Sequence, residues 1–468
     1  IKDYLEQEGI KCRVQSKRFK IGVISLLYNI LLSAYLLLNQ WLWPKLIRRS
    51  IRPSGKVVLL ENFLFLDSFD KKYTLIDRNY PGFFDYYAEE KKNEVWYLSI
   101  LNGIKHPHQW LPLLNSINKS SQQILIMEDY LAIKDYLISF YYSLLLPMKI
   151  KKIPKWRNYD ISHIVLEEAK KELGSYSLIW NILYYRSFSN LKDCKIEPKL
   201  VIDWHENQTI DRALNLGIKK NFPNANIKGY QGFVVSDFYS SLTPTLYEKE
   251  NGLLPDQIYV ISEKLIQKRK KYSNDFNILL APAFRYVNAM HLTKRKKSKK
   301  DRILVALPML YTEAQQVFDL VLGANFDREM EIIIKKHPTV MKKDLLRNVS
   351  IADDSRIKYT DKKLTDLLDE SILFITMTSS AAIESVLSQT YVAIIANRRG
   401  VTANPIENIV DQKYWRLCYT PNCVIDAYNH AKDNPVLNES KYLVPLNRQT
   451  FDDFLIQVLD LFFNCLAL

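Results

Sequence analysis

The sequence predicts an α/β protein made of two doubly wound domains that face each other across a cleft. Three observations predict this fold class. Short apolar runs bounded by polar residues recur along the chain, and such runs are typical of strands buried on both faces. Helical patterns separate these runs, and alternating strands and helices form parallel sheets. The chain has 468 residues, which is more than one ordinary core accommodates.

The first domain is predicted to cover residues 1–293, where strand and helix patterns alternate. Residues 1–20 suggest a helix followed by a short strand. Further strands are predicted at 57–60, 95–98, 124–127, 199–203 and 227–232, and helices at 132–146, 161–173 and 208–220.

The second domain is predicted at 302–445, after a basic linker at 294–301 whose residues 294–300 contain six lysines and arginines. Its strands are predicted at 302–308, 331–335, 356–359, 371–375 and 391–395, and its helices at 312–322, 363–369 and 380–387. A terminal segment, 446–468, contains an apolar helix at 451–463 that we expect to pack back on the first domain.

Composition and charge limit the classes of function. The formal net charge is +14, which favours polyanions or anionic lipid as partners. Nucleic acid is the less favoured partner, because zinc-finger spacing is absent and the one dense basic run is a connector. Five scattered cysteines without a Cys-x-x-Cys pair argue against a disulfide framework and a structural zinc site. We therefore expect a reducing, cytoplasmic compartment.

One segment, Ile21 to Pro44, carries no charge over 24 residues and has basic residues on both flanks. By length it suits a membrane span, although Asn29, Asn39 and Gln40 interrupt it. An interfacial helix anchored by tryptophans and cationic flanks fits equally well. The third interpretation is a buried helix of the first domain.

Two polar clusters in the second domain predict an anion site. Lys336, His337 and Pro338 follow one strand, where a lysine and a histidine provide donors for phosphate and proline fixes the turn. The other cluster lies between a strand and a helix start, where free backbone N–H groups favour an anion, and it consists of Thr378, Ser379 and Ser380, with Glu384 in the helix. Adjacent strands would bring both clusters to one sheet edge. The alternatives are a basic surface turn and an ordinary helix cap.

A third polar group follows a buried strand of the first domain. There Asp203 and Glu206 are candidates for a general base or a nucleophile towards an anomeric carbon, and Asp237 is a further candidate. The residues expected to contact the acceptor or substrate are His205, Asn207, Gln231 and Arg285. The alternative is that Asp203 or Asn207 caps the next helix, with Glu206 on its first turn and Asp237 in an exposed loop.

Several common motifs are absent from the sequence. There is no glycine-rich phosphate loop, no His-Glu-x-x-His and no Gly-x-Ser-x-Gly, and the chain has only twelve glycines. Phosphate would therefore be held by a helix start and a histidine. No acidic metal cluster is evident, so we expect neither a metal nor another cofactor.

Some stretches resemble known families. Residues 203–208, 224–232 and 254–260, together with 281–286, are similar to bacterial surface-carbohydrate proteins of the O-antigen and capsule type. That resemblance implies the GT-B glycosyltransferase fold of two Rossmann-like domains. The pairs His337-Pro338 and Ser379-Ser380 resemble the paired motifs of bacterial sialyltransferases and Kdo transferases. The second resemblance implies a CMP-activated 2-keto sugar acid, such as Kdo or a nonulosonic acid, as donor.

These resemblances lead to a functional hypothesis. The chain is expected to transfer a 2-keto sugar acid from a CMP sugar to a glycan or lipid-linked acceptor, peripheral to the inner face of the bacterial inner membrane. Three alternatives remain: a nucleotide-sugar epimerase, a CDP-polyol phosphotransferase, and a non-catalytic assembly protein of a polysaccharide complex. The last would depend mainly on segment 21–44.

Overall fold

The protein is described by a computed structural model. It describes residues 23–47, 53–150, 159–271, 274–292, 301–327, 329–337, 340, 345, 347, 354–434 and 442–456. The helix and strand predicted at 1–20, the linker residues 294–300, Pro338 and the end of the predicted C-terminal helix lie outside these residues. The predicted domain boundaries at 293 and 302 therefore stay a prediction.

The first sheet has seven strands in the order β3-β2-β1-β4-β5-β6-β7. They are β1 (Gly55–Leu64), β2 (Val95–Leu101), β3 (Ile124–Ile126), β4 (Ile196–Trp204), β5 (Asn226–Gln231), β6 (Gln257–Val260) and β7 (Ile278–Leu280). The helices between them are α3 (Phe83–Tyr86), α4 (Pro107–Lys119), α5 (Ile133–Met148), α6 (Ser162–Lys171), α7 (Tyr176–Asp193), α8 (Thr209–Asn221), α9 (Leu246–Glu250) and α10 (Glu263–Arg269). All seven residues of β2 are buried, as expected for a strand covered on both faces.

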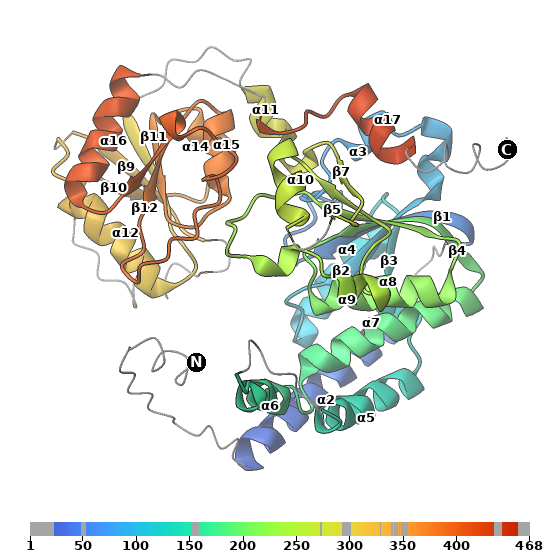
Figure 1. Cartoon of the computed structure of the whole chain (residues 1–468). Helices are drawn as coiled ribbons and strands as arrows, with labels where there is room; N and C mark the ends of the chain where they lie inside the picture. The colour runs from blue at the N-terminus through green and yellow to red at the C-terminus, as the bar shows by residue number, and fades with distance from the viewer. Residues whose placement is uncertain are drawn as a thin grey trace. The chain divides into compact units, whose positions relative to one another are not determined.

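The second sheet has six strands in the order β10-β9-β8-β11-β12-β13. They are β8 (Arg302–Ala306), β9 (Glu331–Lys335), β10 (Ile357–Tyr359), β11 (Leu373–Thr376), β12 (Tyr391–Ile395) and β13 (Trp415–Cys418). The remaining described helices of this part of the chain are α11 (Val287–Leu292), α12 (Tyr311–Gly323), α14 (Leu364–Leu368), α15 (Ala381–Leu387), α16 (Pro421–Asp433) and α17 (Arg448–Ile456), of which α17 packs on residues of the first sheet. Figure 1 shows α12 and α16 on one side of this sheet and α15 on the other. Two parallel sheets with interleaved helices confirm the predicted α/β class.

Contacts divide the chain into two compact units that do not follow sequence order. The first unit contains the described residues up to Asp77, together with Glu90–Lys228 and Tyr247–Asp256. The second unit contains Arg78–Glu89, Gly229–Leu246 and the described residues from Gln257 onwards.

The C-terminal helix α17 is held by an aromatic cluster within the second unit. Phe451 packs edge-on against Phe83 with ring centroids 5.2 Å apart, and Phe454 packs in the same way against Tyr259 at 5.0 Å. Both phenylalanines are almost fully buried. The helix forms where it does because these two side chains, three residues apart, lie on one face.

Most of the uncharged segment 21–44 forms the long helix α2 (Val23–Leu46). Among the described helices, none combines the length and hydropathy that crossing a bilayer requires. One face of α2 is buried in the first unit through Leu36 and Leu37, whereas Leu31 on the other face is 69% exposed. The helix is therefore neither fully buried nor fully exposed.

Candidate functional site

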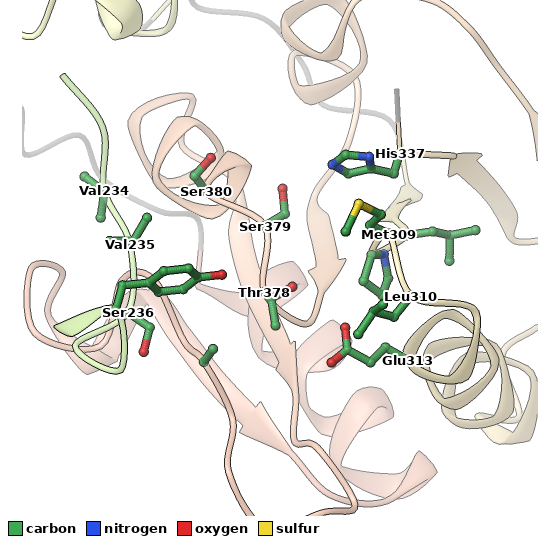
Figure 2. A pocket seen from close by; sticks show the side chains of 14 residues that line it. Val234, Val235, Ser236, Met309, Leu310, Glu313, His337, Thr378, Ser379 and Ser380 are labelled. Atoms are coloured by element: carbon green, nitrogen blue, oxygen red, sulfur yellow. The ribbon is translucent and has the colours of Figure 1, made fainter. Parts of the chain in front are cut away.

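A pocket of about 420 Å³ opens at the carboxyl ends of strands in the second sheet (Figure 2). All fourteen of its lining residues belong to the second unit. They are Val234, Val235, Ser236, Tyr239, Leu307, Pro308, Met309, Leu310, Glu313, His337, Thr378, Ser379, Ser380 and Ala403. Four residues predicted to bind the nucleotide (His337, Thr378, Ser379 and Ser380) therefore line one pocket.

Strand register explains why these residues meet. Ala306 of β8 pairs with Lys335 of β9, and Val305 of β8 pairs with Ile375 of β11. The three strands are parallel and end at nearly the same level, so the residues that follow them gather at one edge.

One detail of the prediction is wrong: the strands that precede the two polar clusters are not neighbours in the sheet. β9 and β11 are not adjacent, because β8 lies between them. The sequence order of strands in a doubly wound sheet differs from their spatial order, and the sheet starts in its middle at β8. The residues that follow β8, Leu307 to Leu310, consequently form part of the pocket wall, and they were not predicted.

His337 supplies a titratable donor to the pocket. Burial, aided by the positive charge of Lys336, holds the pKa of His337 below its usual value of 6.5. Lys336 itself is not a lining residue, and its Nζ lies 3.8 Å from the carboxylate of Asp361. Lys336 therefore influences the pocket through its positive charge, without lining it.

The hydroxyl residues follow β11. The Thr376 side chain donates to the Ala306 carbonyl at 3.1 Å, which ties the end of β11 to β8. The backbone N–H of Ala381 donates to Ser379 Oγ at 3.2 Å, so this hydroxyl partly serves the start of α15, as in the helix-cap alternative. Figure 2 shows the side chains of Ser379 and His337 facing the same space.

Glu384, predicted to bind the nucleotide, lies in α15 outside the pocket lining. Burial raises the pKa of the Glu384 carboxyl, and the positive charge of Arg285 opposes this shift. Arg285, predicted to contact the acceptor, is exposed, and its positive charge acts on the Glu384 carboxyl.

Glu313 is a lining residue that was not predicted. It lies in the first turn of α12, five residues after Pro308. Burial raises the pKa of its carboxyl, with Arg399 opposing the shift, and Asn397 Nδ2 donates to Glu313 Oε1 at 3.4 Å. The sequence signal that could have identified Glu313 was its position as an acidic residue in the helix after the first strand of this domain.

The predicted polar group after β4 forms a separate site in the first unit. Asp203 and His205 are buried, and His205 Nδ1 lies 2.9 Å from Asp203 Oδ2. Glu206 is half-buried, and its two carboxylate oxygens accept from Trp204 Nε1 at 3.1 Å and Gln208 Nε2 at 2.6 Å. Of these carboxylates, Glu206 is the one that reaches the surface.

Asn207 has a positive φ of 54°, which is uncommon for a residue other than glycine. Its side-chain Nδ2 donates to Glu248 Oε1 at 3.2 Å. Asp211 Oδ2 accepts from the backbone N–H of Gln208 at 2.7 Å. The cap of α8 is therefore formed by Asp211, and the expected caps Asp203 and Asn207 have other contacts.

Asp203 belongs to a buried group of three carboxyls with Glu61 of β1 and Asp211 of α8. Their oxygen atoms lie within 4.8 Å of one another. The register pairs Leu60 with Ile202, which places Glu61 beside Asp203 on neighbouring strands. The sequence did not reveal this cluster, because Glu61 lies more than 140 residues from Asp203 and Asp211; the signal was a glutamate within an apolar strand.

The cluster shares protons at neutral pH. Burial raises the pKa of Asp203 to about 7, and it raises the pKa of Glu61 and of Asp211 well above the usual range. Three carboxyls this close in a dry interior cannot all ionise without a counter-charge. Carboxylates also bind hard cations, but Glu61 already accepts from the Tyr184 hydroxyl at 2.8 Å and the Trp204 N–H at 3.1 Å.

Two other predicted residues have protein partners. Asp237 accepts from Lys268 Nζ at 2.5 Å and from Asn408 Nδ2 at 2.6 Å. Gln231 is buried, accepts from Arg269 Nε at 2.5 Å and donates to the Leu242 carbonyl at 3.2 Å. The Gln231 amide therefore stabilises the loop that leads to pocket residues 234–239.

Comparison with known proteins gives similarity in structure only. No protein-family model and no curated protein sequence matches the chain. A UDP-N-acetylglucosamine 2-epimerase from Listeria monocytogenes is 10% identical, with 88% of this chain and 97% of that chain covered, at a TM-score of 0.50. MnaA of S. aureus with UDP is 11% identical over 88% and 97%, at 0.48. The lipopolysaccharide outer core galactosyltransferase WaaB is 12% identical over 86% and 100%, at 0.42. The likeness to the Listeria structure confirms the predicted GT-B fold.

Proposed function

We propose that the protein is a glycosyltransferase that binds a nucleotide sugar in the pocket of the second unit. The observation that carries this proposal is the meeting of His337, Thr378, Ser379 and Ser380 in one pocket at the carboxyl ends of parallel strands. Ligands of open α/β sheets bind at this edge. One imidazole and three hydroxyls there provide the donors that a phosphate accepts.

These hydrogen-bond donors would stabilise the nucleotide as it leaves the sugar. None of the described lining residues is a lysine or arginine, so among them a phosphate would be neutralised by an imidazolium, hydroxyls and backbone N–H groups. His337 is held neutral by burial and by Lys336 until a phosphate arrives. A bound phosphate would raise the His337 pKa, and the resulting charge would stabilise the leaving group.

The rest of the pocket suits a nucleoside. Leu307, Pro308 and Leu310 provide an apolar wall, and Tyr239 provides an aromatic face on which a base can stack. The Glu313 carboxylate is an acceptor for ribose hydroxyls. Glu384 and Lys336 would contribute from outside the lining.

Among the three carboxylates predicted for catalysis, we favour Glu206. Asp203 is buried in the acidic cluster, and Asp237 is paired with Lys268. Glu206 is half-buried at a strand end, with His205 and Asn207 beside it in sequence. Its role would be that of general base for an acceptor hydroxyl or of nucleophile.

The finer proposal is a CMP-linked 2-keto sugar acid as donor and a glycan or lipid-linked acceptor. It is supported by the resemblance of His337 and the Ser379-Ser380 pair to the motifs of sialyltransferases and Kdo transferases. Synthesis of a bacterial surface polysaccharide at the inner face of the inner membrane would follow from such a donor.

A second candidate is a UDP-sugar epimerase. The Listeria protein of the same fold is assigned as a UDP-N-acetylglucosamine 2-epimerase. The same pocket would hold UDP, and the reaction would end with the nucleotide still attached to the sugar.

Nucleotide release separates the two candidates. The protein is incubated with CMP-Kdo, CMP-sialic acid and UDP-N-acetylglucosamine, and both free nucleotide and sugar products are measured. Release of CMP supports the transferase, and conversion of the UDP sugar without release supports the epimerase. If neither reaction occurs with any of these donors, both candidate functions are contradicted.

Matched variants test the pocket itself. His337→Ala should strongly reduce thermal stabilisation by CMP, whereas His163→Ala, whose side chain is 74% exposed on α6, should keep it. Equal stabilisation of both variants would contradict the placement of the nucleotide.

A further inference from the structure

Two neighbouring helices of the first unit, α2 and α5, present apolar faces to the outside. On α2 the exposed side includes Leu27, Leu31 and Leu38, at 52, 69 and 56% exposure. On α5 it includes Leu137 and Tyr141, at 67 and 59%. The spacing of these residues, three or four apart and multiples of it, places each set on one helix face.

The buried faces of the same helices carry polar side chains beside the apolar Leu36, Leu37 and Tyr136. On α2, the Ser33 hydroxyl donates to the Gly174 carbonyl at 2.9 Å, and the Gln40 amide donates to Glu128 Oε1 at 2.8 Å. Both side chains are almost fully buried. The polar groups that a water-facing helix would turn outwards are therefore used to attach α2 to the unit.

Helix α5 likewise buries several polar side chains. Its buried positions include Asp135, Ser139 and Ser143, and Asp135 is paired with Arg186 at 2.6 Å. A surface helix in water shows the opposite pattern, with polar residues outside and apolar residues inside. Two helices that bury several polar groups while exposing large apolar side chains favour an apolar environment on the outer side.

The two faces lie close together. Helices α2 and α5 contact each other, and α5 also contacts α6, where Ile164 and Leu166 are exposed. Figure 1 shows α2, α5 and α6 grouped at one end of the first unit. Scattered exposed leucines are ordinary, but large exposed apolar residues gathered on helices that contact one another indicate a binding surface.

The stretches of sequence that contain α2 and α5 are rich in basic residues. Residues 17–52 contain seven lysines and arginines and no acidic residue. Residues 130–158 contain six, and the one acidic residue there, Asp135, is buried and paired. Lys45, Lys134 and Lys149 are exposed at the helix ends. An apolar face bordered by cations is complementary to an anionic lipid surface, which takes leucines between its headgroups and attracts lysines to its phosphates.

We infer that the α2–α5 surface, made of Leu27, Leu31, Leu38, Leu137 and Tyr141, docks on an anionic phospholipid bilayer without crossing it. The inference deepens the proposed function, because it identifies the surface that would bring the enzyme to a lipid-linked acceptor. It does not depend on which nucleotide sugar the pocket binds.

Flotation with lipid vesicles tests the inference. The full chain is mixed with phosphatidylcholine vesicles with and without about 30% phosphatidylglycerol. Wild type should float with the anionic vesicles only, and binding should weaken when salt is raised from about 0.1 M to about 0.5 M. The double variant Leu31→Asp/Leu137→Asp should bind at least about tenfold more weakly, because charge replaces two insertion residues.

The control is Tyr247→Asp, because Tyr247 is 70% exposed on α9 of the same unit and lies outside the surface. It should bind vesicles like wild type. Binding of the double variant at wild-type strength, or no binding of wild type to anionic vesicles, would overturn the inference. So would a wild-type dimer that the double variant converts to a monomer, since the surface would then bind a second copy. Thermal stabilisation by CMP, measured on the same variants, should be unchanged and reports separately on the pocket.

Discussion

At the residue scale, the site depends on groups whose protonation the fold controls. Burial and Lys336 lower the pKa of His337, which then binds a phosphate best after taking up a proton. Burial raises the pKa of Asp203 and its neighbours. The cluster therefore keeps protons that carboxyls in water would release. We therefore expect both nucleotide binding and the stability contributed by the carboxyl cluster to weaken as pH rises.

CMP should bind more tightly as pH falls from about 8 to about 5.5, because His337 must gain a proton to pair with the phosphate. The phosphate titrates in this range too, so the comparison with His337→Ala isolates the histidine. Across this range we expect Kd, measured by calorimetry, to change about tenfold more in wild type than in His337→Ala. The same dependence in His337→Ala and wild type would show that the histidine does not meet the phosphate.

The carboxyl cluster should make the protein less stable as pH rises. The pKa of Asp203 is about 7 in the folded chain and 3.8 in the unfolded chain, so the folded state holds more protons between these values. Its contribution, on the order of a few kcal/mol, is complete below pH 3.8 and is lost as pH rises through about 7.

Asp203→Asn should reduce this loss, since the amide oxygen can still accept from His205 and Asn215. Urea unfolding at several pH values measures the slope. The exposed Asp193→Asn at the end of α7 should leave the slope unchanged. An equal slope in Asp203→Asn and wild type would rule out proton sharing by this residue.

At the element scale, apolar runs in the sequence located many strands well. The predicted strands 331–335 and 391–395 match β9 and β12 residue for residue, because both are buried runs bounded by polar residues. The helix predicted at 208–220 is α8 at Thr209–Asn221. Strand β13 and helix α7 were not predicted, since Arg416 interrupts the short strand and polar residues recur all round the helix.

The site was predictable only in part, for a related reason. His337 and Ser379 follow predicted strands, so their positions at a sheet edge could be expected. Strand order could not be read from the sequence, so the contribution of Leu307 to Leu310 after β8 was missed. Glu61 was missed because only the tertiary fold brings it to Asp203.

Close packing of α7 on α8 depends on Gly217. A Cβ atom there would stand 2.5 Å from Phe188 Cδ2 and 3.2 Å from the Tyr185 carbonyl oxygen. Gly217→Ala should therefore destabilise the protein by about 1–3 kcal/mol, although alanine favours a helix by about 1 kcal/mol. Chemical unfolding measures the change in the free energy of unfolding.

The double variant Gly217→Ala/Phe188→Leu is the matched test. Leucine removes ring atoms that the new methyl would meet, so the two substitutions should be less damaging together than their sum. Additive effects would show that the methyl clashes elsewhere.

At the scale of the whole molecule, the two compact units have different chemical content. The second unit contains the pocket, with donors for a phosphate and an apolar wall. The first contains the proton-sharing cluster, Glu206 and the α2–α5 surface. The net charge of +14 attracts anionic partners to the chain as a whole. This attraction is not a property of either site by itself. This division suggests that nucleotide binding and lipid docking can be measured separately on one protein.

Hydrogen exchange with saturating CMP should show that division directly. We expect protection of backbone N–H groups in residues 301–313, 329–337, 373–387 and 232–240, which form or adjoin the pocket. Strands β1, β2 and β3 of the first unit should exchange as in the free protein, because a ligand slows opening only where it binds. His337→Ala should lose the protection under the same conditions. Protection centred on residues 203–211 would instead place the nucleotide at the end of β4 and would make Glu206 a nucleotide contact.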